Sequence, residues 1–202
     1  MAFTFFFRDL HVIELVARFL VPDLAGRHHP LTWDAGCAMG QEPYTLAMVL
    51  AERMNHFAFS NLKIHASDLD DCDTFGDIIK KAVYPRQELE RIPPEIFQKY
   101  FEPDSDPDHF RVVDRIRDRI VFHKHNLTSL KAIGGNFSLV LCKNVLLHLQ
   151  QEERIAVMKM FHAALTPGGL MAFEQTQKLP PELSGHFEQI ASDGEVFRRL
   201  EI

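Results

Sequence analysis

The residues best suited to bind a ligand form a short stretch around two glycines, Gly36 and Gly40. An acidic residue, Asp34, precedes them, and an apolar helical pattern that begins near Pro43 follows. Glycine has no Cβ, so such a loop lets a ligand approach the backbone, and the helix start offers N–H groups. The glycines lie four residues apart, unlike those of the dinucleotide-binding G-x-G-x-x-G loop. A tight strand-to-helix turn would use the same residues, so the loop alone does not establish a site.

A second acidic position, Asp68, lies at the end of the next expected strand. In doubly wound sheets a carboxylate at this place accepts hydrogen bonds from two ribose hydroxyls. Aspartate is also a preferred helix-capping residue, and Asp70 is better placed for that role. We therefore expect Asp70 to cap the following helix and Asp68 to serve a ligand. Both the glycine loop and Asp68 fall at the carboxyl ends of neighbouring strands, where ligands bind in such sheets.

The elements that must position these residues alternate between strand and helix patterns. Main strands are expected at 31–35, 62–66, 137–142 and 170–173. Helices are expected at 5–20, from 43 onward, at 71–83 and at 150–165. Pro22 and Gly26 would end the first helix, and the segment 167–169 would form a turn. This order predicts an α/β fold with a doubly wound, mostly parallel sheet and helices on both faces.

Two further patterns add antiparallel pieces to this sheet. Short strands at 110–113 and 119–122 predict a small β excursion, and we assign a β-subdomain to roughly 102–122. The segments 187–190 and 196–200 surround Asp193-Gly194 and predict a closing C-terminal hairpin. With 202 residues, the chain is assigned to one domain over 1–202.

Composition excludes several classes of protein. The net charge of −6 gives no basic footprint for general nucleic-acid binding. No stretch of 18 apolar residues exists, so no membrane insertion is expected. The three cysteines are far apart and form no CxxC pair, which favours a reducing, cytoplasmic setting. The pairs His28-His29 and His123/His125 lack further ligands at matching spacing, so no metal site is predicted.

Six short motifs follow one another along most of the chain. They are TFFFR at 4–8, AGCAMGQEPY at 35–44, SDLD at 67–70, HNL at 125–127, LCKNV at 141–145 and PGG at 167–169. In type and order they resemble T-x-F-F-R, G-x-x-x-G-E-E-P-Y, S-D-I-D, N-L, F-C-R-N-V and P-G-G. These motifs belong to the CheR family of S-adenosylmethionine-dependent methyltransferases, which methylate glutamate side chains of bacterial chemoreceptors.

The resemblance implies a class I methyltransferase fold, with S-adenosylmethionine as cofactor and S-adenosylhomocysteine as its product. The cofactor-binding residues that it implies are Thr4, Arg8, Gly36, Gly40, Glu42, Asp68, Asn126, Leu127 and Asn144. Asp68 would hold the ribose, residues 126–127 would flank the adenine, and Glu42 would face the methionine amino group. Thr4 and Arg8 would cover the sulfonium end, with Arg8 near the substrate carboxylate.

The chemistry of ester formation suits this assignment. A glutamate carboxylate has a reference pKa of about 4.3 and is already ionised at neutral pH. Methyl transfer from a sulfonium to this carboxylate is a direct displacement, so the enzyme has to align the reactants and needs no general base. Arg8 could hold the carboxylate through two hydrogen bonds and present one oxygen for attack.

Three departures from the family pattern keep other functions open. The chain starts at the T-x-F-F-R motif, so the family's N-terminal helical domain, which contributes to receptor docking, is expected to be absent. Lys143 stands in place of arginine, and these cations are not equivalent at a bidentate site. His148 replaces a tyrosine near the methyl group, where it could accept a proton from a hydroxyl or amine. A histidine hydrogen-bonded at a helix start would explain the same residue equally well.

We therefore carry three interpretations, with Arg8 and His148 as candidate catalytic residues. The first is an enzyme that methylates a glutamate carboxylate of a methyl-accepting protein. The second keeps the cofactor but methylates a small-molecule hydroxyl, carboxyl or amine with the help of His148. The third is a non-catalytic module that binds the cofactor or a partner. The sequence leaves the oligomeric state open, as well as whether the β excursion binds a peptide.

Overall fold

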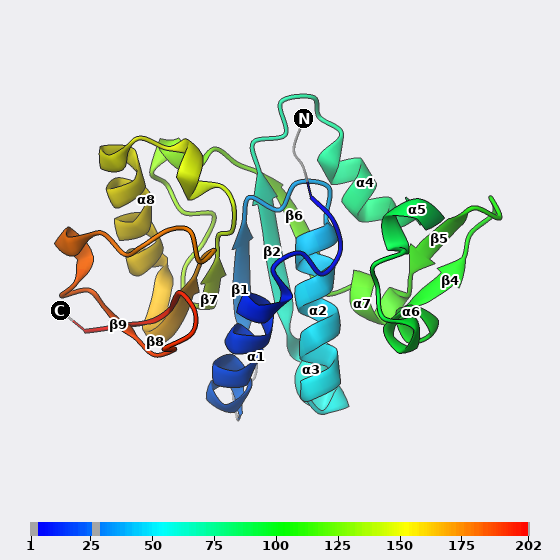
Figure 1. Ribbon diagram of the computed structural model, residues 1–202, viewed down its shortest axis with the longest axis horizontal. Coiled ribbons are helices and arrows are strands. Elements are labelled where there is room, and N and C mark those ends of the chain that lie inside the picture. Colours follow the sequence, from blue (N-terminus) through cyan, green and yellow to red (C-terminus); the bar gives the residue numbers. More distant parts are fainter. Residues whose placement is uncertain (1–3, 26–28, 202) are drawn as a thin grey trace.

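A seven-stranded sheet forms the centre of the computed structural model, which describes residues 4–25 and 29–201 (Figure 1). Its strand order is β6-β2-β1-β7-β8-β10-β9. The strands are β1 (Leu31–Ala35), β2 (Lys63–Asp68), β6 (Ile120–Lys124), β7 (Phe137–Leu141), β8 (Leu165–Ala172), β9 (Phe187–Gln189) and β10 (Val196–Arg199). The strands β6, β2, β1, β7 and β8 run parallel, whereas β10 pairs antiparallel with both β8 and β9. The predicted α/β sheet with an antiparallel C-terminal hairpin is therefore confirmed.

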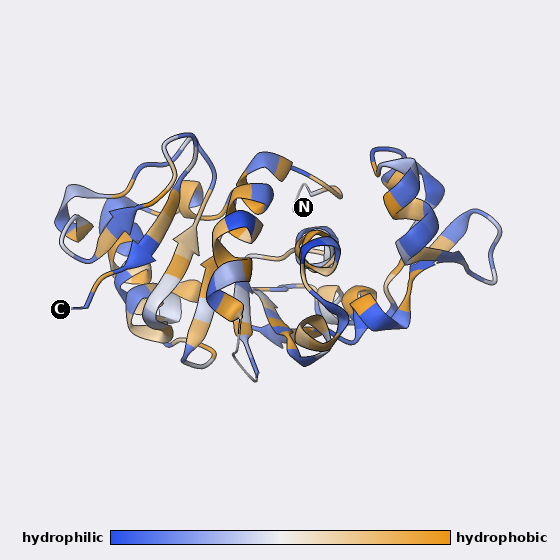
Figure 2. Ribbon diagram, turned by 90° about the horizontal axis from the view of Figure 1, so that it is seen from below, coloured by the Kyte–Doolittle hydropathy of each residue, from blue (hydrophilic) through white to orange (hydrophobic). Residues whose placement is uncertain are grey.

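Helices cover both faces of this sheet. The helices around the main sheet are α1 (Leu10–Leu24), α2 (Gln41–Arg53), α3 (His56–Asn61), α4 (Phe75–Lys81) and α8 (Gln151–Ala164), and single 3₁₀ turns occur at η1 (Leu127–Ser129), η2 (Leu146–His148) and η3 (Pro181–Leu183). Successive strand residues point to opposite faces. Accordingly Leu139 and Leu141 of β7 pack in the core with α1 and α2, whereas Val140 packs with α8. Apolar residues follow the strands and the inner sides of the helices in Figure 2.

The N-terminal segment differs from the helix that the sequence predicts over 5–20. Residues 6–9 form turns, with a left-handed backbone at Phe7 (φ 62°) and Asp9 (φ 47°), and α1 begins only at Leu10. The cause is packing: Phe6 is fully buried, and its ring lies edge-on to that of Tyr84 at 4.9 Å. The Phe7 N–H donates to the hydroxyl of Thr45 in α2 over 3.0 Å. These contacts hold the segment against α2 instead of extending α1.

The end of α1 also differs from the prediction. The helix continues through Pro22 to Leu24. A proline inside a helix leaves one carbonyl without its usual partner, here that of Arg18. Arg18 is exposed, so water can satisfy this group. The expected stop at Pro22 was therefore wrong. The other expected stop, Gly26, lies outside the described residues, as does His28 of the histidine pair at 28–29.

The small sheet begins earlier in the chain than the predicted excursion at roughly 102–122, although the strand predicted at 110–113 belongs to it. Its order is β3-β5-β4, formed by β3 (Val83–Pro85), β4 (Phe101–Pro103) and β5 (His109–Val112). The short helices around it are α5 (Arg86–Leu89), α6 (Pro94–Tyr100) and α7 (Asp114–Arg117), and the unit projects from one end of the molecule (Figures 1 and 2). The apolar segment that begins at Ile120 is not part of it, because β6 pairs in parallel with β2 of the main sheet. The single turn of α7 separates the two sheets.

The segment 167–169 lies inside β8 and is not the turn expected before this strand. Gly168 has a φ of 70°, and the pairing of β8 with β7 shifts register between Phe137 and Leu139. A Cβ on Gly169 would come within 3.0 Å of the Phe137 carbonyl oxygen, so glycine permits the close strand approach. The irregularity is a bulge, which bends a strand without ending it.

Candidate active site

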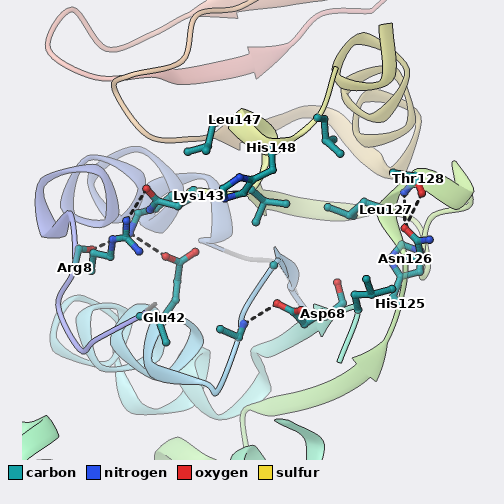
Figure 3. A pocket seen from close by; sticks show the side chains of 18 residues that line it. Arg8, Glu42, Asp68, His125, Asn126, Leu127, Thr128, Lys143, Leu147 and His148 are labelled. Atoms are coloured by element: carbon teal, nitrogen blue, oxygen red, sulfur yellow. Dashed lines mark hydrogen bonds and ion pairs between the residues drawn. The ribbon is translucent and has the colours of Figure 1, made fainter. Parts of the chain in front are cut away.

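A cavity of about 710 Å³ opens at the carboxyl ends of β1, β2 and β7, beneath the N-terminal segment. This volume falls within the range typical of small-molecule sites, which is about 300–1,000 Å³. The residues that line the cavity come from five separate parts of the chain: Thr4, Arg8, Gly36, Ala38, Glu42, Ser67, Asp68, Leu69, His125, Asn126, Leu127, Thr128, Lys143, Asn144, Val145, Leu147, His148 and Leu149. Figure 3 shows them from close by.

The cavity brings together nearly every residue that the sequence suggested for the site. The suggested residues that line it are Thr4, Arg8, Gly36, Glu42, Asp68, Asn126, Leu127, Asn144 and His148. Gly40 does not belong to the lining. A Cβ at Gly40 would lie 2.8 Å from both a side-chain carbon of Ile79 and the hydroxyl of Tyr84. Its small size, together with a φ of 98°, therefore serves the packing of α2.

Gly36 supports the cavity floor directly after β1. Its N–H donates to the carbonyl of Ser67 over 2.7 Å, which joins the glycine loop to the end of β2. A Cβ at this position would lie 2.1 Å from Val145 Cγ2, and the φ of 104° is one that other residues rarely adopt. Glycine is therefore required here so that the loop can lie against the segment that follows β7.

Asp68, the last residue of β2, and Asp70, two residues later, have different hydrogen-bond partners. Asp70 accepts the N–H groups of Thr74 at 2.9 Å and Phe75 at 3.1 Å, so it caps the start of α4. Burial acts to raise the pKa of Asp70, but these backbone hydrogen bonds outweigh it and lower the pKa. Asp68 accepts one N–H, from Ala38 over 2.9 Å, through Oδ2. No described residue donates to its Oδ1, so this oxygen is available to a ligand in the cavity.

A buried ion pair lies at the opposite end of the cavity. The side chain of Lys143 is 0% exposed, and its Nζ lies 3.0 Å from Glu42 Oε2. The same ammonium donates to the backbone carbonyl of Arg8 over 2.8 Å. The second oxygen of Glu42, Oε1, has no hydrogen-bond partner in the described part of the chain. Glu42, which lines the cavity, therefore keeps one buried carboxylate oxygen that no described N–H or O–H donor satisfies.

Asn144 fastens the N-terminal segment over this end. Its Oδ1 accepts from Arg8 Nη2 over 3.0 Å, and its Nδ2 donates to Asp9 Oδ2 over 3.2 Å. The backbone of Asn144 is left-handed, with a φ of 59°, and its N–H donates to Glu174 Oε2 over 2.8 Å. The buried Glu174 thus holds the strained turn that aims Asn144 at Arg8.

The far end of the cavity is formed by the turn after β6. Asn126 Oδ1 accepts from the N–H of Thr128 over 2.9 Å and from its hydroxyl over 2.8 Å, so it caps η1. Leu127 packs partly against the core formed with α8 and leaves an apolar surface toward the cavity. This end combines a fixed polar turn with an apolar wall, which suits a flat heterocycle.

His148 lies at the rim of the cavity in η2 and is exposed. Its ring makes no hydrogen bond to any residue in 4–25 or 29–201, so the expected hydrogen-bonded histidine at a helix start is not found. The neighbouring Leu147 is 40% exposed. His148 therefore lies at the exposed rim of the cavity, beside Leu147 (Figure 3).

Sequence reasoning did not predict that three charged residues of this region, Asp34, Lys143 and Glu174, are buried. An acidic residue within the apolar strand at 31–35 was a usable signal for Asp34. Glu174 follows a strand at its carboxyl end, which is the same signal that identified Asp68. Neither signal identifies the groups with which these two residues interact, because those groups come from distant parts of the chain.

Across the described ranges, no group of three or more His, Cys, Asp or Glu residues is arranged to hold a metal ion. His123 instead meets His65 on the neighbouring strand, with 2.8 Å between ring nitrogens. In the same part of the chain, no helix has both the length and the apolar character needed to cross a bilayer.

The residues present fit S-adenosylmethionine in three places. The unsatisfied Glu42 oxygen suits the ammonium of the methionine part, and the available Asp68 oxygen suits the ribose hydroxyls. The wall at Asn126 and Leu127 suits the adenine. Figure 3 shows Arg8, Glu42 and Lys143 on one side, residues 126–128 on the other, and Asp68 between them, which is the order of the groups in the cofactor.

Comparison with known proteins gives the same family that the motifs suggested. The family model described as "CheR methyltransferase, SAM binding domain" matches residues 2–196. The chain is 27% identical to a chemotaxis protein methyltransferase of Vibrio anguillarum, over 98% of this chain and 72% of that protein. It is 30% identical to chemotaxis protein methyltransferase 1 of Pseudomonas aeruginosa, over 96% of this chain and 73% of that protein.

Solved structures with low sequence identity share the fold. Magnesium protoporphyrin IX methyltransferase from Synechocystis PCC 6803, solved with bound SAM, aligns with a TM-score of 0.51 at 18% identity, covering 95% of this chain and 76% of that one. PKMT2 from Rickettsia typhi, in complex with AdoHcy, aligns with a TM-score of 0.51 at 14% identity, covering 86% of this chain and 26% of that one. The motifs, the sheet and the family match agree: the chain belongs to the CheR family and is an S-adenosylmethionine-dependent methyltransferase with a class I fold.

Proposed function

We propose that this enzyme transfers the methyl group of S-adenosylmethionine to a glutamate carboxylate of a protein, forming a methyl ester. The observation that carries the proposal is the guanidinium of Arg8, which Asn144 fixes at the mouth of the cavity over 3.0 Å. Its side chain is only 27% exposed, so it lies at the boundary between the cavity and solvent. A fixed arginine there is suited to an anionic acceptor.

The cofactor would supply an activated methyl group on a sulfonium. The protein's part is then to bind, to orient and to exclude water. Glu42 binds the ammonium, Asp68 the ribose hydroxyls and the turn at 126–128 the adenine. Arg8 presents five N–H donors in a planar fork that matches the geometry of a carboxylate. Because the acceptor is already ionised, alignment of its oxygen with the methyl group and sulfur is the main requirement.

The names of the relatives support a protein as acceptor. They are called chemotaxis protein methyltransferases, and this chain covers 72% of the first two. We propose a methyl-accepting protein of the same kind as the partner. The proposal treats 1–202 as one catalytic domain that carries the small sheet. It places the enzyme in the cytoplasm, in line with three cysteines that form no disulfide.

His148 is the residue that favours a different acceptor. It lines the cavity at the rim, and a neutral histidine there could take a proton from a hydroxyl or an amine. The second candidate function is therefore O- or N-methylation of a small molecule.

The experiment that separates these functions measures where methyl label goes. The protein is incubated with methyl-labelled S-adenosylmethionine and a lysate of the organism that makes it. Protein-bound label is then treated with mild base. Volatile label, released as methanol, is expected, because carboxyl methyl esters hydrolyse under these conditions. A matched reaction with Arg8→Ala should give little volatile label while still binding S-adenosylhomocysteine.

Two other results would contradict the proposal. Base-stable label on protein would indicate an amine as acceptor, and label only in small molecules would exclude a protein acceptor. Loss of either kind of label in His148→Phe would then identify His148 as the proton acceptor.

A further inference from the structure

Asp34, the fourth residue of β1, is fully buried, and none of the residues in 4–25 or 29–201 donates a hydrogen bond to either of its carboxylate oxygens. An ionised carboxylate in that position would lose its hydration and gain no donor in return, which is strongly unfavourable. Asp34 does not line the cavity, so it cannot meet a ligand directly. Its charge state must therefore be set by the groups packed around it.

Those groups come from three neighbouring elements. Glu42 of α2 lies within side-chain hydrogen-bonding reach of Asp34, and Asp68 at the end of β2 adds a second negative charge nearby. Burial raises the pKa of the Cys37 and Cys142 thiols, which also lie near enough for the charge of Asp34 to raise the pKa of each. Lys143, which follows β7, is a cation close enough to act on Asp34, and its ammonium is bonded to Glu42.

The charges of Asp34, Glu42 and Lys143 do not balance if both carboxyl groups are ionised. One ammonium, on Lys143, would face two carboxylates, on Asp34 and Glu42. Two carboxyl groups in contact at a buried site hold one proton between them, because like charges at such short range are unfavourable. Burial, followed by the charge of Glu42, raises the pKa of Asp34 well above its usual value. The geometry and the charge count thus agree.

We propose that Asp34 carries a proton hydrogen-bonded to Glu42, and that it releases this proton when the ammonium of S-adenosylmethionine or S-adenosylhomocysteine binds at Glu42. This inference rests on the assignment of Glu42 in the proposed function. Before binding, a neutral Asp34, an anionic Glu42 and a cationic Lys143 sum to zero. After binding, the charges of the two carboxylates are balanced by those of two ammonium groups, and the sum is again zero. The proton moves along the hydrogen bond to Glu42, which lines the cavity, and from there to water.

Asp34 is therefore a positioning residue that makes the site selective for ligands with an ammonium group. The test uses calorimetric titration of the whole protein with S-adenosylhomocysteine. Titrations in two buffers of different ionisation enthalpy count the protons released. We expect about one proton per ligand, and an association constant that rises about tenfold per pH unit below neutrality. 5′-Methylthioadenosine has the same nucleoside but no ammonium, so it should bind without releasing a proton.

The matched variant is Asp34→Asn. The amide can donate a hydrogen bond to Glu42, as a protonated carboxyl does, but it cannot ionise. We expect S-adenosylhomocysteine to bind at least about tenfold more weakly to this variant, which corresponds to about 1.4 kcal/mol, and without proton release. Binding of 5′-methylthioadenosine should not change.

Three results would overturn the inference. The first is wild-type protein that binds S-adenosylhomocysteine without releasing a proton, and this measurement needs no variant to fold. The second is unchanged affinity in Asp34→Asn, which would mean that Asp34 stays protonated and only supports structure. The third is proton release that persists in Asp34→Asn, because the proton would then come from another group. Failure of the wild type to bind S-adenosylhomocysteine at all would instead contradict the proposed function.

Discussion

The clearest prediction contrasts two aspartates of one turn, Asp68 and Asp70, by giving both the same substitution. Asp68 Oδ2 accepts the Ala38 N–H over 2.9 Å, and the account assigns its Oδ1 to the ribose. In Asp68→Asn a single oxygen remains, and the Ala38 N–H already requires it. The amide NH₂ of the variant would then face the ribose hydroxyls, whose hydrogen bonds the carboxylate oxygen of the wild type would have accepted.

The magnitude follows from the loss of at least one charge-assisted hydrogen bond. Such a bond contributes about 1.5–3 kcal/mol, so affinity for S-adenosylhomocysteine should fall about 10- to 150-fold. The fold itself should be nearly unaffected, since the Ala38 N–H keeps an acceptor. Calorimetric titration gives the affinity, and urea unfolding gives the stability.

Asp70→Asn is the matched control, and it should show the opposite pattern. Asp70 does not line the cavity, and it accepts backbone N–H groups at the start of α4. Affinity should stay within about twofold, while the free energy of unfolding should fall by about 1 kcal/mol. Because the folded pKa of Asp70 is lowered, its stabilisation is present above the unfolded value and is lost as pH falls through the folded one. The stability difference from wild type should therefore shrink in acid.

Two results would refute this reasoning. Unchanged affinity in Asp68→Asn would remove Asp68 from the cofactor site. Equal losses of affinity in both variants would mean that the whole turn, and not the Asp68 carboxylate, supports binding.

Three further predictions address the acceptor side and the floor of the cavity. Arg8→Lys should lower kcat with the methyl-accepting protein at least about tenfold and change affinity for S-adenosylhomocysteine little, because lysine lacks the bidentate fork; the reverse pattern would assign Arg8 to the cofactor. His148→Phe should leave carboxylate methylation within about threefold of wild type, since an ionised acceptor needs no base; loss of ester formation would contradict this. Gly36→Ala should lower the free energy of unfolding by roughly 3 kcal/mol, because its Cβ would lie 2.1 Å from Val145 Cγ2. Gly135→Ala, whose Cβ would meet nothing within 4 Å, should leave stability nearly unchanged in the same urea series.

Local patterns predicted the parts of the fold that local forces determine. The apolar strand at 137–141, the alternation of strand and helix, and the capping role of Asp70 all follow from residue types within one segment. These features placed Asp68 and Gly36 at the same edge of the sheet, where the cavity lies.

The errors arose where distant residues decide the structure. Burial of Phe6 against Tyr84 keeps the N-terminal segment out of α1, although its sequence has a helical pattern. The apolar segment at 120–124 reads equally well as part of a small hairpin, but β2 offers it a parallel partner in the main sheet. Spacing along the chain does not reveal which of two available partners a strand takes.

The sequence predicted most of the residues that line the cavity, with Gly40 as the exception, but it did not predict their electrostatics. The motifs suggested Glu42 and Arg8, and the substitution of lysine at 143 was read as a weakness at a bidentate contact. The structure shows Lys143 buried between Glu42 and the Arg8 carbonyl, where one ammonium holds both groups at the same end of the site. Only the fold brings Asp34 against this pair, so its proton could not be inferred from spacing.

The central claim is that a glutamate carboxylate of a protein accepts the methyl group. The most direct measurement is mass-spectrometric mapping of the modified residue, after reaction of the enzyme and S-adenosylmethionine with proteins of its own source. The account predicts the mass of one methyl group on a glutamate side chain, removed by mild base and absent when Arg8→Ala replaces the wild type. A methyl group on lysine, histidine or a hydroxyl side chain, stable to base, would contradict it.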